Sequence, residues 1–394
     1  MSGGQVSEFS LEVFFAKYEF TAKYLLCCSD AETFSMKEIL ALADEETQDM
    51  WDNLQLCYTE APGHPVLKEE IAKAFYPTLS SEEIYTFAGA EEGIYACMRA
   101  LLNPGDHAIA MTPCYQSLIS VAEACCDDGT SSAKGVTAVD LVEVDGRWIL
   151  DLDIVRAAIV PGKTKMIILN YPHNPSGALL TAAEQDAVVE LAREHDLWVF
   201  FDEVYRGLEI DDSNRLQPMA TKYEKALSLG VMSKSLGMAG LRIGWICTQD
   251  KVAMQKIADF KHYLSICNSA PAEILSIMAL RGKDQLLERN RALIAKNLLI
   301  VDAFMLKYGH LFEWCPPIAG CIGFMKFKAT DKMSLEELAD VLVTKFGCLI
   351  LPGIHFSFGD KETFKSHFRF GFGRTNFSEC IEQFQLALDS IFST

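Results

Sequence analysis

Several side chains that can do chemistry fall directly after short apolar runs of this sequence. In chain order they are Gly89-Ala90-Glu91, Tyr115, Asn174, Asp202 with Tyr205, Ser233-Lys234 and Arg242. A lysine amine can form a Schiff base with an aldehyde, and a buried carboxylate can hold a protonated ring nitrogen. A small-residue turn at a helix start, helped by an arginine, suits a phosphate group. The combined chemistry is that of a phosphorylated aldehyde cofactor.

Each of these features also has a plain structural explanation, which is the better one when the feature is taken alone. The acidic turn at Gly89 can simply start a helix, Asn174-Pro175-Ser176-Gly177 can be a turn, and Asp202 can cap the next helix. Their occurrence together, each after a different apolar run, instead predicts a pyridoxal 5′-phosphate site. A nicotinamide site is disfavoured because no Gly-x-Gly-x-x-Gly follows the first run.

The apolar runs are typical of strands that are buried on both faces of a parallel sheet. The predicted strands are 84–87, 108–111, 166–170, 198–202, 226–230 and 243–248, and helical patterns such as 90–102 and 182–195 lie between them. This alternation predicts an α/β fold with a mostly parallel, seven-stranded type of sheet covered by helices. Ligands bind beyond the carboxyl ends of such strands, where the candidate residues fall.

A smaller α+β unit is predicted after this sheet. Its expected elements are a helix over 283–307, strands at 321–327 and 348–351, a helix at 335–345 and a last helix from Ser378. The aromatic helix predicted over 11–24 has no strand partner nearby in sequence, so we expect it to pack against this unit. The expected domains are a large cofactor-binding domain over 49–281 and a small domain made of 1–48 with 282–394.

Composition narrows the possible partners and the compartment. The chain carries 35 Lys and Arg against 54 Asp and Glu, a formal net charge of −19, which disfavours nucleic acid and anionic membranes. Residues 1–12 lack a basic and then apolar pattern, and no apolar run reaches about 18 residues. The 13 cysteines are odd in number and form no C-x-x-C pair, so neither disulfides nor a metal site are expected. These observations predict a soluble, cytoplasmic protein.

The order and spacing of the motifs resemble those of the class I and II aminotransferases, which have the aspartate aminotransferase fold. The resemblance rests on Asn174-Pro175-Ser176-Gly177, Asp202-x-x-Tyr205, Ser233-Lys234 and Gly240-x-Arg242-x-Gly244. It extends over most of the chain, from Tyr58-Thr59-Glu60-Ala61-Pro62-Gly63 to Phe368-Arg369-Phe370. It implies pyridoxal phosphate as the cofactor, an amino acid and a 2-oxo acid as substrates, and a homodimer with shared active sites.

The resemblance also implies a role for each residue that matches around the cofactor ring. Lys234 would form the aldimine and then move the substrate's α-proton as a general acid and base. Asp202 would pair with the pyridine nitrogen, and Tyr205 and Asn174 would bond the ring hydroxyl. Tyr115 would stack on the face of the ring. Lys234, Asp202 and Tyr205 are therefore the candidate catalytic residues.

The phosphate and the substrate receive their own residues from the same resemblance. The phosphate would be held by Gly89, Ala90, Glu91 through its backbone, Ser233 and Arg242. Tyr58 would reach the phosphate from the neighbouring subunit. Arg369, with Asn174 beside it, would clamp the α-carboxylate of the substrate, because a guanidinium can bind a carboxylate through two hydrogen bonds.

Two departures from the family pattern bear on this reading. Many relatives have a hydroxyl three residues before the lysine, where this chain has Val231, so Ser228 or Ser233 is expected to supply that contact. The N-terminal arm is similar to the branch that includes capreomycidine synthase, which acts on an arginine derivative. Ser29 is accordingly a candidate substrate contact. Asp30 or Glu32 either meets a cationic substrate tail or belongs to a solvated helix start.

The leading hypothesis is an aminotransferase that moves an amino group between an L-amino acid and a 2-oxo acid by way of the Lys234 aldimine. The alternative keeps the cofactor but ends in β- or γ-elimination, replacement or cyclisation. Motifs do not separate these outcomes, because they do not record which substrate bond stands perpendicular to the ring. A regulatory protein that binds DNA is disfavoured by the net charge of −19 and by the complete chemical set.

Overall fold

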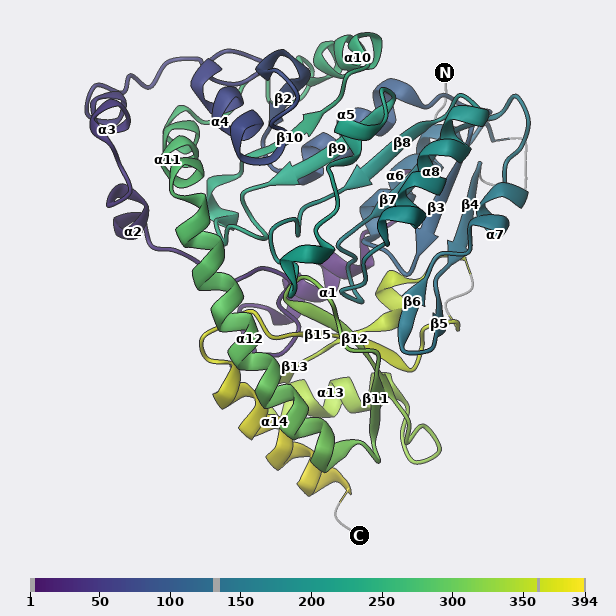
Figure 1. Cartoon of the computed structure of the whole chain (residues 1–394). Helices are drawn as coiled ribbons and strands as arrows, with labels where there is room; N and C mark the ends of the chain where they lie inside the picture. The colour runs from purple at the N-terminus through teal and green to yellow at the C-terminus, as the bar shows by residue number, and fades with distance from the viewer. Residues whose placement is uncertain (1–3, 130–134, 360–361, 393–394) are drawn as a thin grey trace.

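A seven-stranded sheet forms the centre of the larger part of the computed structural model, which describes residues 4–129, 135–359 and 362–392. The strand order is β2-β10-β9-β8-β7-β3-β4 (Figure 1). The strands are β2 (Ile84–Phe87), β3 (His107–Thr112), β4 (Val136–Asp140), β7 (Thr164–Asn170), β8 (Trp198–Asp202), β9 (Ala226–Val231) and β10 (Gly244–Cys247). The predicted α/β fold, with its mostly parallel sheet, is confirmed.

Burial on both faces explains why these strands are apolar throughout. In β7, Met166 and Ile168 belong to one hydrophobic cluster, while Ile167 and Leu169 belong to the other. One cluster includes side chains of α4 (Pro65–Phe75), α5 (Ala90–Leu101), α6 (Gln116–Cys126), α10 (Lys251–Lys261) and α11 (Ala270–Arg281). The other includes side chains of α7 (Leu152–Ala157), α8 (Ala182–Glu194) and α9 (Met219–Lys222). The helices thus cover both faces.

Two features of the sheet differ from the prediction. Strand β10 runs antiparallel to both of its neighbours, β2 and β9. An apolar run reports burial but not strand direction, so its sequence could not show this. Strand β4 was not expected because most of its residues are only half-buried, which is typical of an edge strand. The hairpin of β5 (Val142–Val144) and β6 (Arg147–Ile149) follows it.

The smaller part contains a four-stranded antiparallel sheet in the order β11-β12-β15-β14. Its elements are β11 (Phe312–Trp314), β12 (Ile322–Phe327), β14 (Leu351–Pro352) and β15 (His367–Gly371), with α12 (Lys283–Tyr308), α13 (Leu335–Phe346) and α14 (Phe377–Phe392). The strand predicted at 348–351 is divided. Its first half, β13 (Cys348–Leu349), pairs with β1 (Tyr24–Leu25), and β14 joins the larger sheet of this part.

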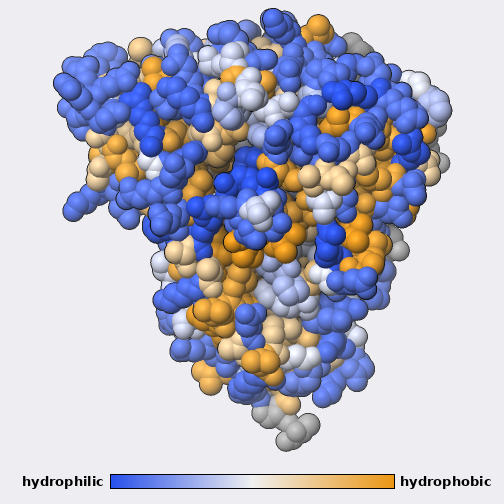
Figure 2. Space-filling view, viewed as in Figure 1, coloured by the Kyte–Doolittle hydropathy of each residue, from blue (hydrophilic) through white to orange (hydrophobic). Residues whose placement is uncertain are grey.

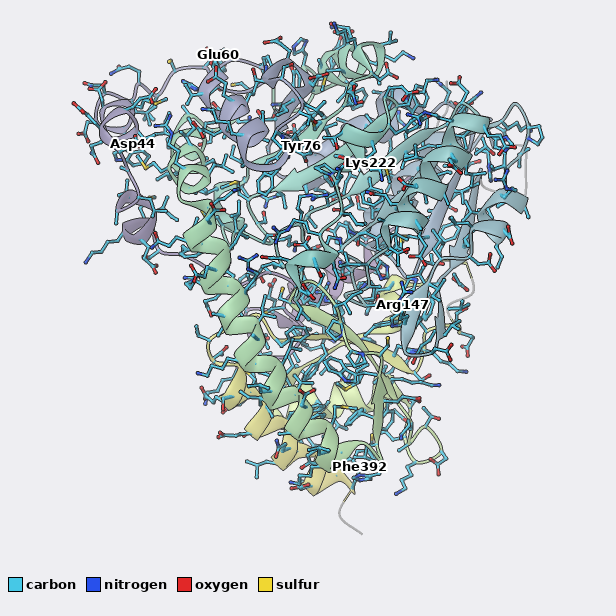
Figure 3. The ribbon with its side chains drawn as sticks, in the orientation of Figure 1. Asp44, Glu60, Tyr76, Arg147, Lys222 and Phe392 are labelled. Atoms are coloured by element: carbon cyan, nitrogen blue, oxygen red, sulfur yellow. The ribbon has the colours of Figure 1, made fainter. Side chains whose placement is uncertain are left out.

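The N-terminal segment contacts both parts. Helix α1 (Ser10–Tyr18) lies between the seven-stranded sheet and the C-terminal strands (Figure 1). It ends earlier than predicted, and the chain continues in a turn in which Thr21 Oγ1 donates to the carbonyl of Tyr18. Helices α2 (Met36–Leu40) and α3 (Glu45–Asp52) pack against α11. Arg281 of α11 binds Asp44, which Figure 3 places at the outer edge of the molecule.

The surface is mainly hydrophilic on the side shown in Figure 2, and apolar side chains appear there as separate patches. Among the helices of the described residues, none has both the length and the apolar character that a membrane span needs.

Candidate active site

A cavity of about 490 Å³ opens at the carboxyl ends of the sheet strands, between the sheet and α1. It is lined by most of the residues predicted from the sequence: Ser29, Ala90, Glu91, Tyr115, Asn174, Asp202, Tyr205, Ser233, Lys234, Arg242 and Arg369. Gly89 lies directly behind Arg242. Tyr58 does not line the cavity, since its side chain is 85% exposed. The structure therefore brings together every predicted site residue except Tyr58.

Lys234 follows β9 and extends into this cavity. Its Nζ donates a hydrogen bond to Ser29 Oγ at 3.0 Å, and its carbonyl accepts from Ala31 N at 3.3 Å. Burial lowers the pKa of Lys234, and the nearby Asp30 opposes that shift. An amine with a lowered pKa is unprotonated in a larger fraction of molecules, which is the form that attacks an aldehyde. The chemistry expected of Lys234 is therefore available at this position.

Asp202 and Tyr205 mark the end of β8 beneath the cavity. Asp202 Oδ1 accepts from Val204 N at 3.1 Å, and burial raises the pKa of Asp202 to about 7. A buried carboxylate of this kind is stabilised by a cationic or hydrogen-donating partner. The Tyr205 hydroxyl is buried and makes no hydrogen bond of good geometry within the described residues, although the Ser29 side chain is close enough to affect its pKa. Both groups need a polar ligand.

The start of α5 and the Arg242 turn form a close-fitting cradle. Gly89 has φ +91°, and a Cβ there would collide with the Arg242 guanidinium, while a Cβ on Gly244 would meet the backbone of Gly89 and Ala90. Ser233 Oγ is buried in the same region and makes no hydrogen bond within the described chain. Backbone N–H groups at a helix start, a guanidinium and a hydroxyl are donors that suit a phosphate.

The two serines considered as substitutes for the missing hydroxyl at Val231 behave differently. Ser228 Oγ already accepts a hydrogen bond from Ala220 N at 2.9 Å and does not line the cavity. Ser233 Oγ lines the cavity and is unpartnered among the residues described. Ser233 is therefore the better candidate for the phosphate contact.

Glu91 adds a side chain where the sequence suggested only a backbone contact. Its Oε1 accepts a hydrogen bond from the Ser117 hydroxyl, its Oε2 is buried without a partner in the described chain, and burial raises its pKa. A raised pKa reduces the negative charge that Glu91 presents near the cradle. This feature makes the carboxylate compatible with an anion bound nearby.

Arg369 is held by the ends of two other segments. It lies on β15, is only 2% exposed, and donates from Nε to Cys27 O at 3.0 Å and from Nη1 to Asn174 Oδ1 at 3.3 Å. The rings of Phe15 and Phe356 lie 5.6 and 5.4 Å from its guanidinium carbon. These contacts fix the plane of the guanidinium and leave further N–H groups for a carboxylate.

Residues that sequence reasoning missed come mainly from α1 and from the turn after β7. Phe9, Leu11, Glu12, Phe15 and Glu19 line the cavity. Their signal was the aromatic, amphipathic pattern of the segment, which predicted a helix but not its position. His173 bridges Pro113 O, at 2.7 Å from Nε2, and Ser176 Oγ, at 2.6 Å from Nδ1. It thereby joins the turn that carries Asn174 to the loop before Tyr115.

Asp30 and Glu32, the two acids considered as partners of a cationic substrate tail, have different surroundings in the structure. Asp30 lines the cavity, but both of its oxygens accept from Arg374 Nη2 at 2.8 and 2.7 Å. Glu32 does not line the cavity, and it accepts from Thr375 N and Oγ1 at 2.7 and 2.8 Å. Neither acid forms part of a solvated helix start, because both tie the N-terminal segment to the chain after β15.

The donor set as a whole fits pyridoxal phosphate. The cradle at Gly89 and Arg242 has no room for a side chain on Gly89. Two buried hydroxyls lack hydrogen-bond partners among the described residues, and the carboxylate of Asp202, with its raised pKa, is buried at the end of β8. These features match a phosphate, a ring hydroxyl and a protonated ring nitrogen, respectively. The Lys234 amine completes the set.

Comparison with known proteins gives the same family by independent routes. The profile described as aminotransferase class I and II matches residues 27–379. An arginine–pyruvate transaminase of Pseudomonas aeruginosa is 33% identical over 196 residues. This match covers 48% of this chain and 47% of the relative, so the matched segment spans about half of the relative's length. Capreomycidine synthase of Streptomyces vinaceus is 25% identical over 89% of this chain and 87% of its own. A pyridoxal-phosphate-dependent aminotransferase structure from Streptococcus suis aligns over 98% of both chains, with a TM-score of 0.87 and 26% identity.

Proposed function

The chain belongs to the class I and II aminotransferases, which are pyridoxal-phosphate-dependent enzymes, and on that premise we propose that it transfers the amino group of an L-amino acid to a 2-oxo acid. The observation that carries the proposal is the single cavity that contains Lys234, Asp202 and Arg369. A reactive amine, a carboxylate for the ring nitrogen and a guanidinium for the α-carboxylate are the groups that amino transfer requires.

Lys234 is the general base of this proposal. Bound pyridoxal phosphate supplies an electron sink that makes the α-proton of the amino acid removable. Because burial lowers the pKa of Lys234, its Nζ can take that proton from the substrate Cα and hold it for return. Asp202 would hold a protonated ring nitrogen, and Tyr205 and Asn174 would bond the ring hydroxyl, so that these residues would orient the bound cofactor.

Arg369 orients the substrate. Its Nε and Nη1 are fixed by Cys27 O and Asn174 Oδ1, so its remaining N–H groups meet the α-carboxylate in one plane. Fixing the carboxylate places the Cα–H bond within reach of Lys234. Ser29, which accepts from Lys234 Nζ at 3.0 Å and lines the cavity, lies close enough to the amine to contact a substrate bound there.

We also propose a homodimer in which Tyr58 reaches the partner's phosphate. Tyr58, Leu56 and Tyr263 are 85%, 86% and 89% exposed, and exposed apolar side chains of this size mark association surfaces. Thr59 Oγ1 donates to Asn268 O at 3.4 Å and ties the two segments together, and the nearby Glu60 lies at the outer margin of the molecule in Figure 3.

The 13 cysteines, free among the described residues, support a reducing compartment such as the cytoplasm.

A cyclase or lyase is the second candidate function, and the likeness to capreomycidine synthase over 89% of the chain favours keeping it. Both reactions begin with removal of the α-proton, so Lys234, Asp202 and Arg369 would serve either one. They differ in where the amino nitrogen ends. Transamination passes it on for transfer to a 2-oxo acid, elimination releases it as free ammonia together with the loss of a side-chain substituent, and cyclisation keeps it in the product. The fate of the amino group is therefore the measurement that separates them.

The test incubates stoichiometric holoenzyme with single L-amino acids, without an oxo acid, and measures 2-oxo acid by mass spectrometry. Arginine is included because one relative is an arginine–pyruvate transaminase. We expect one equivalent of 2-oxo acid per site with at least one donor, and none with Lys234→Ala. That 2-oxo acid should keep the whole side chain of the donor and form without free ammonia. A cyclised product, or a shortened 2-oxo acid released with ammonia, would overturn transamination. Unchanged activity of Lys234→Ala would remove that lysine from its role.

Sedimentation and cofactor titration test the assembly. We expect a dimer of two 43.8 kDa chains. We expect Tyr58→Phe to weaken cofactor binding without dissociating the dimer. A fully active monomer would refute shared active sites.

A further inference from the structure

Three carboxylates of the N-terminal segment, those of Glu12, Glu19 and Asp30, line the cavity together with Lys234. They differ in how they are paired. Asp30 is neutralised by Arg374, as described above. Among the described residues, the Glu12 carboxylate accepts only from the neutral Tyr115 hydroxyl, at 3.3 Å. The Glu19 carboxylate has no hydrogen bond or ion pair within the described part of the chain.

The cavity's cations cannot neutralise Glu12 and Glu19 once the proposed ligands are in place. The phosphate matches the Arg242 guanidinium, the substrate α-carboxylate matches Arg369, and Lys234 acts as an uncharged base. These assignments leave two carboxylates that line the ligand site, the exposed Glu12 and the half-buried Glu19, without an ion-pair partner among the described residues. A carboxylate that is partly removed from water is stabilised by a nearby cation.

Two further observations bear on this region. The buried hydroxyls of Tyr205 and Ser233, which we assign to the cofactor, have no hydrogen-bond partner among the described residues, so the cavity that Glu12 and Glu19 line is a built ligand site. The pKa of Glu19 is raised by burial first and then by the negative charges of Asp30 and Glu12. A cation placed beside Glu19 would relieve both effects.

We propose that Glu12 and Glu19 bind the positively charged side chain of the amino-acid donor, either an amine or a guanidinium. The inference rests on the proposed function, because it takes Arg369 as the anchor for the α-carboxylate of the same molecule. Binding a zwitterionic head at one end and a cation at the other selects long basic amino acids over neutral ones of equal shape. Glu12 and Glu19 are thus specificity-determining residues.

The test compares L-arginine with L-citrulline, which has nearly the same shape but a neutral side chain. The enzymes are wild-type holoenzyme, Glu19→Gln, Glu12→Gln, the double variant and a matched control, Glu8→Gln. Glu8 precedes α1, is exposed and does not line the cavity. The readouts are kcat/KM for 2-oxo acid formation and, independently of turnover, binding of each amino acid followed by the absorbance of the bound cofactor.

We expect wild-type enzyme to prefer arginine over citrulline in both readouts. Loss of a charge-assisted contact should lower arginine binding and kcat/KM on the order of 10- to 100-fold in Glu19→Gln and further in the double variant. Citrulline binding and the Glu8→Gln control should change less than about twofold. The inference is overturned if wild-type enzyme binds and turns over arginine and citrulline equally well, or if the double variant loses no arginine affinity. Either result leaves the proposed transamination untouched. If arginine binding depends on Glu12 and Glu19 but no 2-oxo acid forms, the result supports the inference and refutes the proposed function.

Discussion

Replacing Gly89 by alanine tests whether the start of α5 is a phosphate cradle. Gly89 has φ +91° and ψ 173°, a region that is nearly reserved for glycine and costs other residues about 1–3 kcal/mol. The new Cβ would also collide with the Arg242 guanidinium, which must then leave its position. Losing a charge-assisted hydrogen bond to the phosphate costs about 1.5–3 kcal/mol, or roughly 10- to 100-fold in cofactor affinity.

The assay titrates the cofactor-free protein with pyridoxal phosphate and measures the dissociation constant by absorbance. Gly162→Ala is the matched control, because Gly162 also has a positive φ, of +77°, but a Cβ there meets nothing within 4 Å. The control should lose about 1 kcal/mol of unfolding free energy and keep its cofactor affinity. Wild-type affinity in Gly89→Ala would refute the cradle. An equal loss of affinity in both variants would show that backbone strain, and not the collision, is responsible.

Three further predictions concern Asp202, Arg369 and His173. Asp202→Asn should bind the cofactor but lower kcat on the order of 10²- to 10³-fold in steady-state assays, because the charge that holds the ring proton is lost. Arg369→Lys keeps the charge but not the planar fork, so kcat/KM should fall on the order of 10- to 100-fold, mainly through KM. Burial lowers the pKa of His173 from its ordinary 6.5 to about 4. Neutral His173 therefore contributes about 3 kcal/mol to the free energy of unfolding at pH values above 6.5, relative to acid conditions. This contribution is lost as the pH falls from 6.5 toward 4. Urea unfolding at pH 7 and 4.5 should show a smaller pH dependence in His173→Gln.

Each of these predictions has a result that contradicts it. A near-normal kcat in Asp202→Asn would show that Asp202 is not the partner of the ring nitrogen. A loss in Arg369→Lys that falls on kcat alone would argue against a role in ground-state carboxylate binding. If His173→Gln has the same pH dependence of unfolding as the wild type, the acid sensitivity arises at other groups.

The residues at the ends of the parallel strands could be placed from the sequence for a physical reason. Strands buried on both faces are apolar throughout, so the first polar residue after each run, such as Asp202, marks the edge of the sheet. Parallel strands bring those edges together. The direction of β10 and the division of 348–351 between two sheets could not be read, because they depend on pairing partners distant in sequence.

The position of α1 was beyond sequence reasoning for a similar reason. Its contacts with the cavity and with α6 join residues more than 100 positions apart, such as Ser10 Oγ to Gln116 Oε1 at 3.0 Å. The helix pattern itself reports only that one face is apolar. Asp30 lines the cavity, but its pairing with Arg374 could not be predicted because it depends on the fold of the distant C-terminal chain.

The division of labour around the cavity has a consequence for how substrate choice can change. In the function we propose, groups at the sheet ends, including Lys234, Asp202 and Arg242, serve the cofactor and the α-proton, which all amino-acid substrates share. The carboxylates that we propose for the side chain, which differs between substrates, lie instead on the N-terminal segment, where Leu11 is the only fully buried residue of α1 among those described. Substitutions there should alter specificity with little cost to folding. The acidic character of the chain, with a net charge of −19, would then act at two levels: the surface disfavours anionic partners, and Glu12 and Glu19, on our proposal, favour a cationic substrate in the cavity.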